Sequence, residues 1–387
     1  MRRQEIKVVY VSTYIPKKCG IATFCKDVTN AINLLNPYAL AEIMVVDEPE
    51  EELEYPWETK YKIIKNDLNT YLQAAEYINQ SGCDIVMIEH EFGIFGGQHG
   101  EYIVPFLEAT DKPTVLTCHT IPENKSGEDG QLLKRIIENC KMIVVMMEQS
   151  KKKLIKKYEI EAKKIAVIPH GTPDLTFEST ERMKKKRKIS NRLVLGNINL
   201  LTETKGVEYT LEAIAEIAKK YPEVMAVIVG QTHPALKRYQ GEKYRNFLKR
   251  KVRQLGIKKN VRFINRYVSL KELIDWLKTM DFYVTPYLDP QQSSSGALAY
   301  AIGAGKVCIS TPYKYAREVL AEERGVLVPY RNSKAIAKAV TDLWENEEER
   351  EKIRHKAYSY GRHMTWAAVA LQHLDLFREV IKKNGKK

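Results

Sequence analysis

Short apolar runs recur along the chain and alternate with segments whose apolar positions are three and four residues apart. A run that is apolar at nearly every position predicts a strand buried on both faces, and the spaced pattern predicts a helix that covers it. Strands that alternate with helices form parallel sheets. The expected strands are 6–12, 42–46, 84–89, 114–118, 142–146 and 165–168 in a first series, and 193–199, 225–230, 261–264, 282–285, 307–310 and 326–328 in a second.

The two series are separated by a stretch that lacks apolar periodicity. Residues 173–190 are strongly charged, which predicts a linker over 176–190. A chain of 387 residues is also too long for one ordinary core and suggests two domains. We therefore expect one α/β domain over 1–175, a second over 191–363, and a final helix within 364–387.

A polar turn rich in small residues follows the strand at 282–285. It carries Ser293, Ser294 and Ser295, and Gly296 stands at the start of a helix that begins at about Ser294. The first N–H groups of a helix lack partners within it, and the macrodipole is positive there, so the turn could hold a phosphate. The alternative is that the serines only cap the helix.

A second strand, loop and helix of the same kind lies upstream. The strand at 193–199 leads into a polar loop over 200–204, and Lys205 and Gly206 begin an amphipathic helix. A lysine in the first turn of a helix is opposed by the macrodipole unless it faces an anion. Lys205 is therefore predicted to be functional.

These two segments resemble the nucleotide-sugar half of the family 4 retaining glycosyltransferases of GT-B fold, the glycosyl transferases group 1. Other matching pieces are spread over nearly the whole chain: YIPKKCGIATF at 14–24, LTCHT at 116–120, IPHGT at 168–172, VIVGQ at 227–231 and VRFINR at 261–266. The resemblance implies an α/β fold of two Rossmann-like domains that face a central cleft. The first domain would bind the acceptor and the second the nucleotide sugar, and the final helix would brace the first domain.

The resemblance also implies how the donor diphosphate is held. Lys205 would stabilise the departing diphosphate, the role that a metal ion serves in other transferases, and no Asp-x-Asp motif is present to hold a metal. The arginine that the family carries five residues before this lysine is Leu200 here. Arg266 is a candidate substitute for it. We expect a reaction that needs no metal.

Two positions depart from the family's pair of glutamates, which fall on Gln292 and Tyr300. The Gln292 amide can still hydrogen-bond sugar hydroxyls, whereas Tyr300 cannot make the bidentate contact of a carboxylate. The resemblance places His119 beside the transferred sugar, in preference to the role of an ordinary core histidine. The expected catalytic residues are therefore His119, Lys205 and Gln292, and the expected donor-binding residues are Gly20, Arg266, Ser293, Ser294, Ser295, Gly296 and Tyr300.

The loop after the strand at 84–89 reads EHEFGIFGGQHG over 89–100. Two histidines and two carboxylates invite a metal interpretation, but no pair has a ligand spacing such as HExxH, and we expect no metal site. Acceptor binding is the preferred interpretation, through Glu89, Glu91 and Phe92, whose ring could stack on a sugar or simply pack. His170 is assigned to the acceptor side as well, with a plain turn as the alternative.

Composition indicates a soluble globular protein, with 44% hydrophobic and 29% charged residues. No apolar run approaches the ~20 residues of a membrane span. The N-terminus leads into a strand rather than a signal segment, so a cytoplasmic location is expected. Six scattered cysteines without a CxxC pair predict free thiols in a reducing compartment.

The net charge of +13 admits more than one explanation. Lys and Arg are spread diffusely, which disfavours a nucleic-acid partner. Basic clusters at 183–188 and 381–387 could make a peripheral contact with anionic lipid or an acidic acceptor. High Lys and Glu contents also occur in proteins from hot environments, where the excess charge identifies no partner.

The leading hypothesis is a transferase that moves a hexose from a nucleoside diphosphate sugar to a hydroxyl acceptor with retention of configuration, without a further cofactor. GDP-mannose is preferred over UDP-glucose as donor. The rival is a degenerate transferase that binds nucleotide sugars without turnover and serves as a partner or regulator. A sugar phosphorylase or nucleotide-sugar epimerase is a third, less favoured reading. The sequence assigns neither the acceptor nor an oligomeric state.

Overall fold

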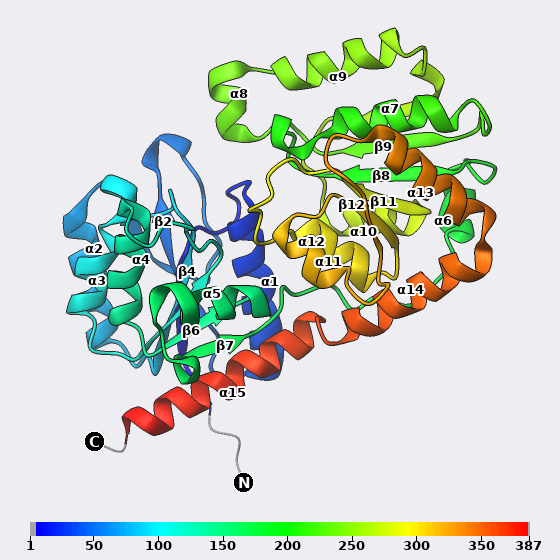
Figure 1. Cartoon of the computed structure of the whole chain (residues 1–387). Helices are drawn as coiled ribbons and strands as arrows, with labels where there is room; N and C mark the ends of the chain where they lie inside the picture. The colour runs from blue at the N-terminus through cyan, green and yellow to red at the C-terminus, as the bar shows by residue number, and fades with distance from the viewer. Residues whose placement is uncertain (1–4, 386–387) are drawn as a thin grey trace. The chain divides into compact units, whose positions relative to one another are not determined.

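The computed structural model describes residues 5–385, which form two compact units. Unit 1 comprises Met1–Gly171 and Trp366–Lys387, and unit 2 comprises Thr172–Thr365. Each unit is a parallel sheet covered by helices (Figure 1). The first four residues of the expected first domain, and Lys386 and Lys387 of the basic cluster at 381–387, lie outside the described residues.

The sheet of unit 1 has seven parallel strands in the order β3-β2-β1-β4-β5-β6-β7. The strands are β1 (Val8–Ser12), β2 (Glu42–Asp47), β3 (Thr59–Ile64), β4 (Ile85–His90), β5 (Thr114–Cys118), β6 (Met142–Val145) and β7 (Ile165–Val167). Six of them confirm the expected strands of the first series. The pattern of apolar runs does not predict β3, because exposed Lys60 and Lys62 alternate with less exposed residues on this edge strand.

Helices cover both faces of this sheet. Val9 and Val11 of β1 pack in one core with α2 (Leu68–Gln80), α3 (Ile103–Ala109), α4 (Glu128–Glu138) and α5 (Glu148–Tyr158). Val8 and Tyr10 point to the other face and pack with α1 (Gly20–Leu35) and the final helix, α15 (Trp366–Asn384). The last helix of the chain is therefore part of unit 1.

The sheet of unit 2 has six parallel strands in the order β10-β9-β8-β11-β12-β13. The strands are β8 (Val194–Ile198), β9 (Met225–Val229), β10 (Val261–Ile264), β11 (Phe282–Thr285), β12 (Val307–Ser310) and β13 (Val326–Leu327). All six expected strands of the second series are present. The helices are α6 (Glu181–Lys186), α7 (Val207–Ile217), α8 (Pro234–Gln240), α9 (Lys243–Gln254), α10 (Leu270–Thr279), α11 (Gly296–Gly303), α12 (Lys314–Val319), α13 (Ser333–Glu345) and α14 (Glu347–Arg362).

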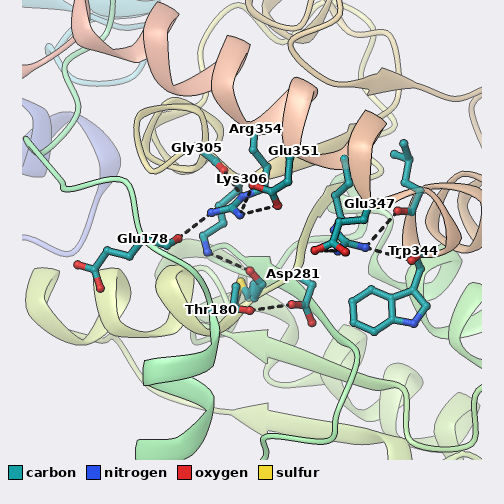
Figure 2. Close-up of polar contacts among 12 residues, drawn as sticks. Glu178, Thr180, Asp281, Gly305, Lys306, Trp344, Glu347, Glu351 and Arg354 are labelled. Carbon is teal, nitrogen blue, oxygen red and sulfur yellow. Dashed lines mark hydrogen bonds and ion pairs between the residues drawn. The ribbon is translucent and has the colours of Figure 1, made fainter.

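The segment 176–190 is part of unit 2 and not the linker that its charge pattern suggests. Its helix α6 buries Lys184, whose Nζ lies 2.7 Å from Asp281 Oδ2. Thr180 donates to the other oxygen of Asp281 at 2.9 Å, and Arg354 Nη2 donates to the carbonyl of Glu178 at 2.7 Å (Figure 2). Charged side chains here point inward to partners, so the absence of apolar periodicity does not indicate an exposed chain.

The same packing changes the interpretation of the basic cluster at 183–188. Met183 and Lys184 are buried, and the Arg187 guanidinium lies 3.6 Å from the centre of the Trp276 ring. Only part of this cluster is therefore available to a partner. None of the helices in residues 5–385 combines the length and the apolar character that a membrane span requires.

Candidate functional site

The strand order of unit 2 reverses between β8 and β11, since the chain builds β9 and β10 on one side of β8 and β11 to β13 on the other. Ligands of open parallel sheets bind outside the carboxyl ends of the strands at such a reversal. Lys205 follows β8 and the serine turn follows β11, so both expected donor elements lie at this position. Unit 1 has the same reversal between β1 and β4.

Lys205 ends a short 3-10 turn, η4 (Glu203–Lys205), and precedes α7. Gly206 joins the two elements in the left-handed conformation, with φ 59°. The expectation that Lys205 lies in the first turn of the helix is therefore wrong. The sequence pattern is that of a helix start, but the glycine changes the chain direction between lysine and helix.

The turn after β8 packs directly on the loop after β11. A Cβ atom at Gly206 would lie 2.2 Å from the carbonyl oxygen of Pro286, and the Leu288 N–H donates to the Thr204 carbonyl at 2.8 Å. Only glycine combines this conformation with this close approach. The backbone thus fixes the position from which the Lys205 side chain extends.

The Lys205 side chain is half-buried, and its ammonium has no carboxylate partner among the described residues. Its Nζ lies 3.9 Å from the centre of the Tyr287 ring, and within residues 5–385 it makes no ion pair. Burial lowers the pKa of Lys205 to about 8, while the negative charge of Asp289 acts in the opposite direction. A cation in this state favours an anionic ligand.

His233 lies in the loop after β9, the strand beside β8. The backbone N–H of His233 donates to the Leu201 carbonyl at 3.1 Å, and this bond holds the loop against the turn that contains Lys205. Burial and the charge of Lys205 both lower the pKa of His233. The histidine is therefore a neutral neighbour of the ammonium.

The ring that Lys205 contacts belongs to a stacked aromatic pair. The Tyr287 and Tyr313 rings stack with centres 5.0 Å apart and an angle of 15°, and the Tyr287 hydroxyl donates to Asn199 Oδ1. Sequence reasoning missed all three residues. The available signal was position alone, because Asn199, Tyr287 and Tyr313 follow the carboxyl ends of β8, β11 and β12 within three residues.

The serine turn makes the contacts of a helix cap. Ser295 precedes α11, and its Oγ accepts a hydrogen bond from the Leu298 N–H at 3.3 Å. Gln292 Nε2 donates to the carbonyl of Ser294 at 2.8 Å, so the turn also holds the amide that was expected to contact the donor sugar. The helix begins at Gly296, two residues later than predicted. Ser293 lies in the same turn.

Two other expected donor residues make contacts within unit 2. Tyr300 lies in α11 and is 6% exposed, so its ring packs in the interior of unit 2. Arg266 follows β10, and its Nη2 lies 2.6 Å from Glu272 Oε1. The Arg266 guanidinium therefore has a carboxylate partner of its own at the surface, which weakens its case as a substitute for the family's arginine.

In unit 1, Gly20 is the exposed first residue of α1, and apart from its chain neighbours and the backbone of its own helix no described atom lies within 4 Å of the place where its Cβ would stand. Cys19 caps this helix, since its Sγ accepts from the Ala22 N–H at 3.3 Å. Lys17, which precedes them, pairs with Glu48 at 2.9 Å. The start of α1 is open to a ligand, and it is equally a plain helix terminus.

Glu89 and His119 form a buried pair at the ends of β4 and β5. His119 Nε2 lies 2.8 Å from Glu89 Oε2, and the Thr117 hydroxyl donates to Oε1 at 3.4 Å. Glu89 is fully buried, so its carboxylate orients His119 rather than facing an acceptor. The structure thus joins an expected catalytic residue to one that was expected to bind the acceptor.

Two further histidines, His90 and His170, lie near this pair, and both have lowered pKa values. Burial and then the charge of His119 lower the pKa of His90 to about 4. Burial lowers the pKa of His170 to about 4 against the opposing effect of the Gly171 carbonyl. The His170 ring packs against Phe24 and Trp366, with centres 5.2 and 5.7 Å away. His170 therefore serves as a packing residue in this structure.

The other expected acceptor residues are linked to their neighbours. Glu91 accepts from the Thr120 hydroxyl at 2.8 Å and from the Phe92 N–H at 3.0 Å. Phe92 is half-buried, with its ring centre 5.0 Å from that of His90. The described residues contain no group of three or more His, Cys, Asp or Glu side chains placed to share a metal ion.

Two family profiles match the chain. The profile described as Glycosyl transferases group 1 matches residues 178–360, and the one described as Glycosyltransferase Family 4 matches residues 45–174. A D-inositol 3-phosphate glycosyltransferase of Corynebacterium glutamicum (strain R) is 20% identical over 295 residues, which cover 70% of this chain and 67% of that protein. Across the curated relatives, the matches span 58 to 67% of the relative's length.

Solved structures show the same fold. HepE of Anabaena, in complex with UDP and glucose, superimposes with a TM-score of 0.75 at 14% identity, covering 96% of this chain and 100% of HepE. Sucrose-phosphate synthase from Thermosynechococcus elongatus gives a TM-score of 0.76 at 15% identity, covering 97% and 100%. Both match the two parallel-sheet, Rossmann-like units described above. The chain therefore belongs to the family 4 glycosyltransferases, the glycosyl transferases group 1, of GT-B fold.

Proposed function

We propose that this glycosyltransferase moves a hexose from a nucleoside diphosphate sugar to a hydroxyl acceptor with retention of configuration. The observation that carries the proposal is the Lys205 ammonium, which lies at the strand reversal of unit 2 with an aromatic ring beneath it and no carboxylate partner in the described chain. A diphosphate supplies the missing negative charge.

The charge of Lys205 acts on the leaving group. As the bond between sugar and diphosphate breaks, negative charge grows on the diphosphate oxygens, and a fixed cation stabilises this charge more than that of the bound donor. In a retaining reaction without an enzyme nucleophile, the acceptor hydroxyl attacks from the leaving-group face and passes its proton to the diphosphate. No metal ion is required in this proposal, because Lys205 supplies the compensating charge.

The donor is a nucleoside diphosphate hexose, with GDP-mannose and UDP-glucose as the two candidates. The serine turn and the loop before Lys205 resemble those of microbial mannosyl and hexosyl transferases of the family, which is the basis for preferring mannose, and the complex of HepE with UDP and glucose favours the alternative. The inositol phosphate acceptor named for the corynebacterial relatives supports only the class, a hydroxyl compound, at 20 to 25% identity.

A second candidate is a nucleotide-sugar-binding protein without turnover. It is favoured by the two positions where the family has glutamates: the Gln292 amide donates to the Ser294 carbonyl and Tyr300 is buried. Both residues make internal contacts, so recognition of the donor sugar would have to come from other groups.

A panel of UDP and GDP hexoses separates the two candidates. We expect one donor to release nucleoside diphosphate with a hydroxyl acceptor, at the same rate with and without a chelator, and proton NMR of the product to show the anomeric configuration of the donor. Binding of donors with no turnover on any acceptor would instead support the degenerate binder. An inverted product would contradict the proposed stereochemistry.

A further inference from the structure

The half-buried Lys205 ammonium contacts an aromatic ring, where a carboxylate would be the usual partner of such a lysine. The distance from Lys205 Nζ to the centre of the Tyr287 ring is 3.9 Å, and cation–π contacts extend to about 6 Å. A carboxylate at this place would neutralise the ammonium and repel a diphosphate. The Tyr287 ring attracts the cation through its quadrupole and leaves the full positive charge available.

The Tyr287 ring is itself fixed on two sides. Tyr287 is 3% exposed, it stacks on Tyr313, and its hydroxyl donates to Asn199 Oδ1. These partners come from the loops after β8 and β12, the strands on either side of β11. Three neighbouring strand ends therefore determine where the ring lies.

A lysine needs such support more than an arginine does. Its side chain has several rotatable bonds and a compact, strongly hydrated charge, so an unsupported ammonium samples many positions. The backbone contact of Gly206 with Pro286 fixes the base of the side chain, and the ring fixes its end. The charged and titratable groups nearby are Asp289 on the loop of Tyr287 and His233 on the loop after β9.

We propose that Tyr287 is the positioning residue that holds the Lys205 ammonium, by a cation–π contact, at the place where the donor diphosphate binds. The inference rests on the proposed function, because it assigns to Lys205 the diphosphate of a sugar nucleotide. Tyr287 does not itself touch the reacting atoms in this account. It determines the position of the group that does.

The test replaces residue 287 by phenylalanine and then by phenylalanines that carry one, two and three ring fluorines. Fluorine withdraws charge from the ring face and weakens the cation–π contact while nearly conserving shape, so the proteins should fold alike. Tyr287→Phe loses the hydrogen bond to Asn199 and serves as the reference of the series. We expect each added fluorine to lower the kcat/KM for the donor below that of Tyr287→Phe, to a total loss of about 3- to 30-fold.

Two controls make the outcome specific. The same fluorinated series at Tyr239, which is 85% exposed on α8, should leave kcat/KM unchanged. In a Lys205→Ala background the series at position 287 should also be flat, because the contact is already lost. The positioning role of Tyr287 would be overturned if kcat/KM did not change with the number of fluorines at position 287 in the otherwise unchanged protein. It would also be overturned if kcat/KM fell equally with and without Lys205.

The result also distinguishes this inference from the proposed function. If Lys205→Ala alone transfers sugar as well as the unchanged protein, the diphosphate role of Lys205 fails and the inference fails with it. If Lys205→Ala loses transfer while fluorination has no effect, the proposed function stands and only the role of Tyr287 is refuted.

Discussion

Both the sequence and the structure single out Lys205, but for different physical reasons. The sequence singles it out because a lysine at a helix start is opposed by the macrodipole, but the structure puts it before the helix, on a turn closed by Gly206. Its distinguishing features are its half-buried position and, among the described residues, the absence of a carboxylate partner, and neither can be read from local spacing. The supporting Tyr287 and Asn199 come from other strand ends, which the chain brings together only on folding.

The titration of Lys205 gives a prediction for the pH dependence of transfer. Because burial lowers its pKa to about 8, the free protein loses this positive charge as pH rises through that value. We expect kcat/KM for the donor to fall on the basic side of about pH 8, approaching tenfold per unit. In Lys205→Arg the charge persists, since arginine stays protonated, so the remaining activity should show no such fall. An identical basic limb in the arginine variant would assign the titration to another group.

Among the elements, strands were predicted well and the connections poorly. Continuous apolar runs identify twelve strands of the two sheets, most of which are buried on both faces. Exposed lysines alternate with less exposed residues along the edge strand β3, so this strand has no such run. The charged segment 176–190 looked like a linker because its buried charges, such as Lys184 on Asp281, are satisfied by partners distant in sequence. The serine turn illustrates the same limit: Ser295 caps α11 and the Gln292 amide binds the Ser294 carbonyl, while a ligand role stays a prediction.

The turn between η4 and α7 yields a prediction for Gly206→Ala. The new Cβ would meet the Pro286 carbonyl in a left-handed conformation, so we expect the free energy of unfolding to fall by ~2 kcal/mol or more and transfer to fall with the displacement of Lys205. Gly256→Ala is the matched control, because Gly256 also has positive φ, at 70°, but open space around it. Denaturant unfolding gives the free energy of unfolding of both variants, and the difference between them measures the cost of the clash with Pro286. Equal destabilisation of the two variants would refute the clash.

At the scale of the whole molecule, the sequence supports the fold more firmly than the chemistry. Two series of strands predict two α/β units, and the family profiles that match 45–174 and 178–360 place both in one family. The candidate site is less predictable: the structure turns Glu89 toward His119 and buries Tyr300. Peripheral contact with anionic lipid stays a prediction, and half-hidden clusters such as 183–188 offer less charge than their sequence suggests.

The most direct test of the account is the initial rate of sugar transfer by Lys205→Ala, measured with the donor that the panel selects. Removal of a preorganised charge from the transition state should lower the rate by ~100-fold or more, with little change in the unfolding midpoint, because Lys205 makes no ion pair with the described residues. Lys219→Ala, an exposed lysine on the same unit, is the control and should transfer normally. A folded Lys205→Ala protein that transfers sugar at the rate of the unchanged enzyme would contradict the account.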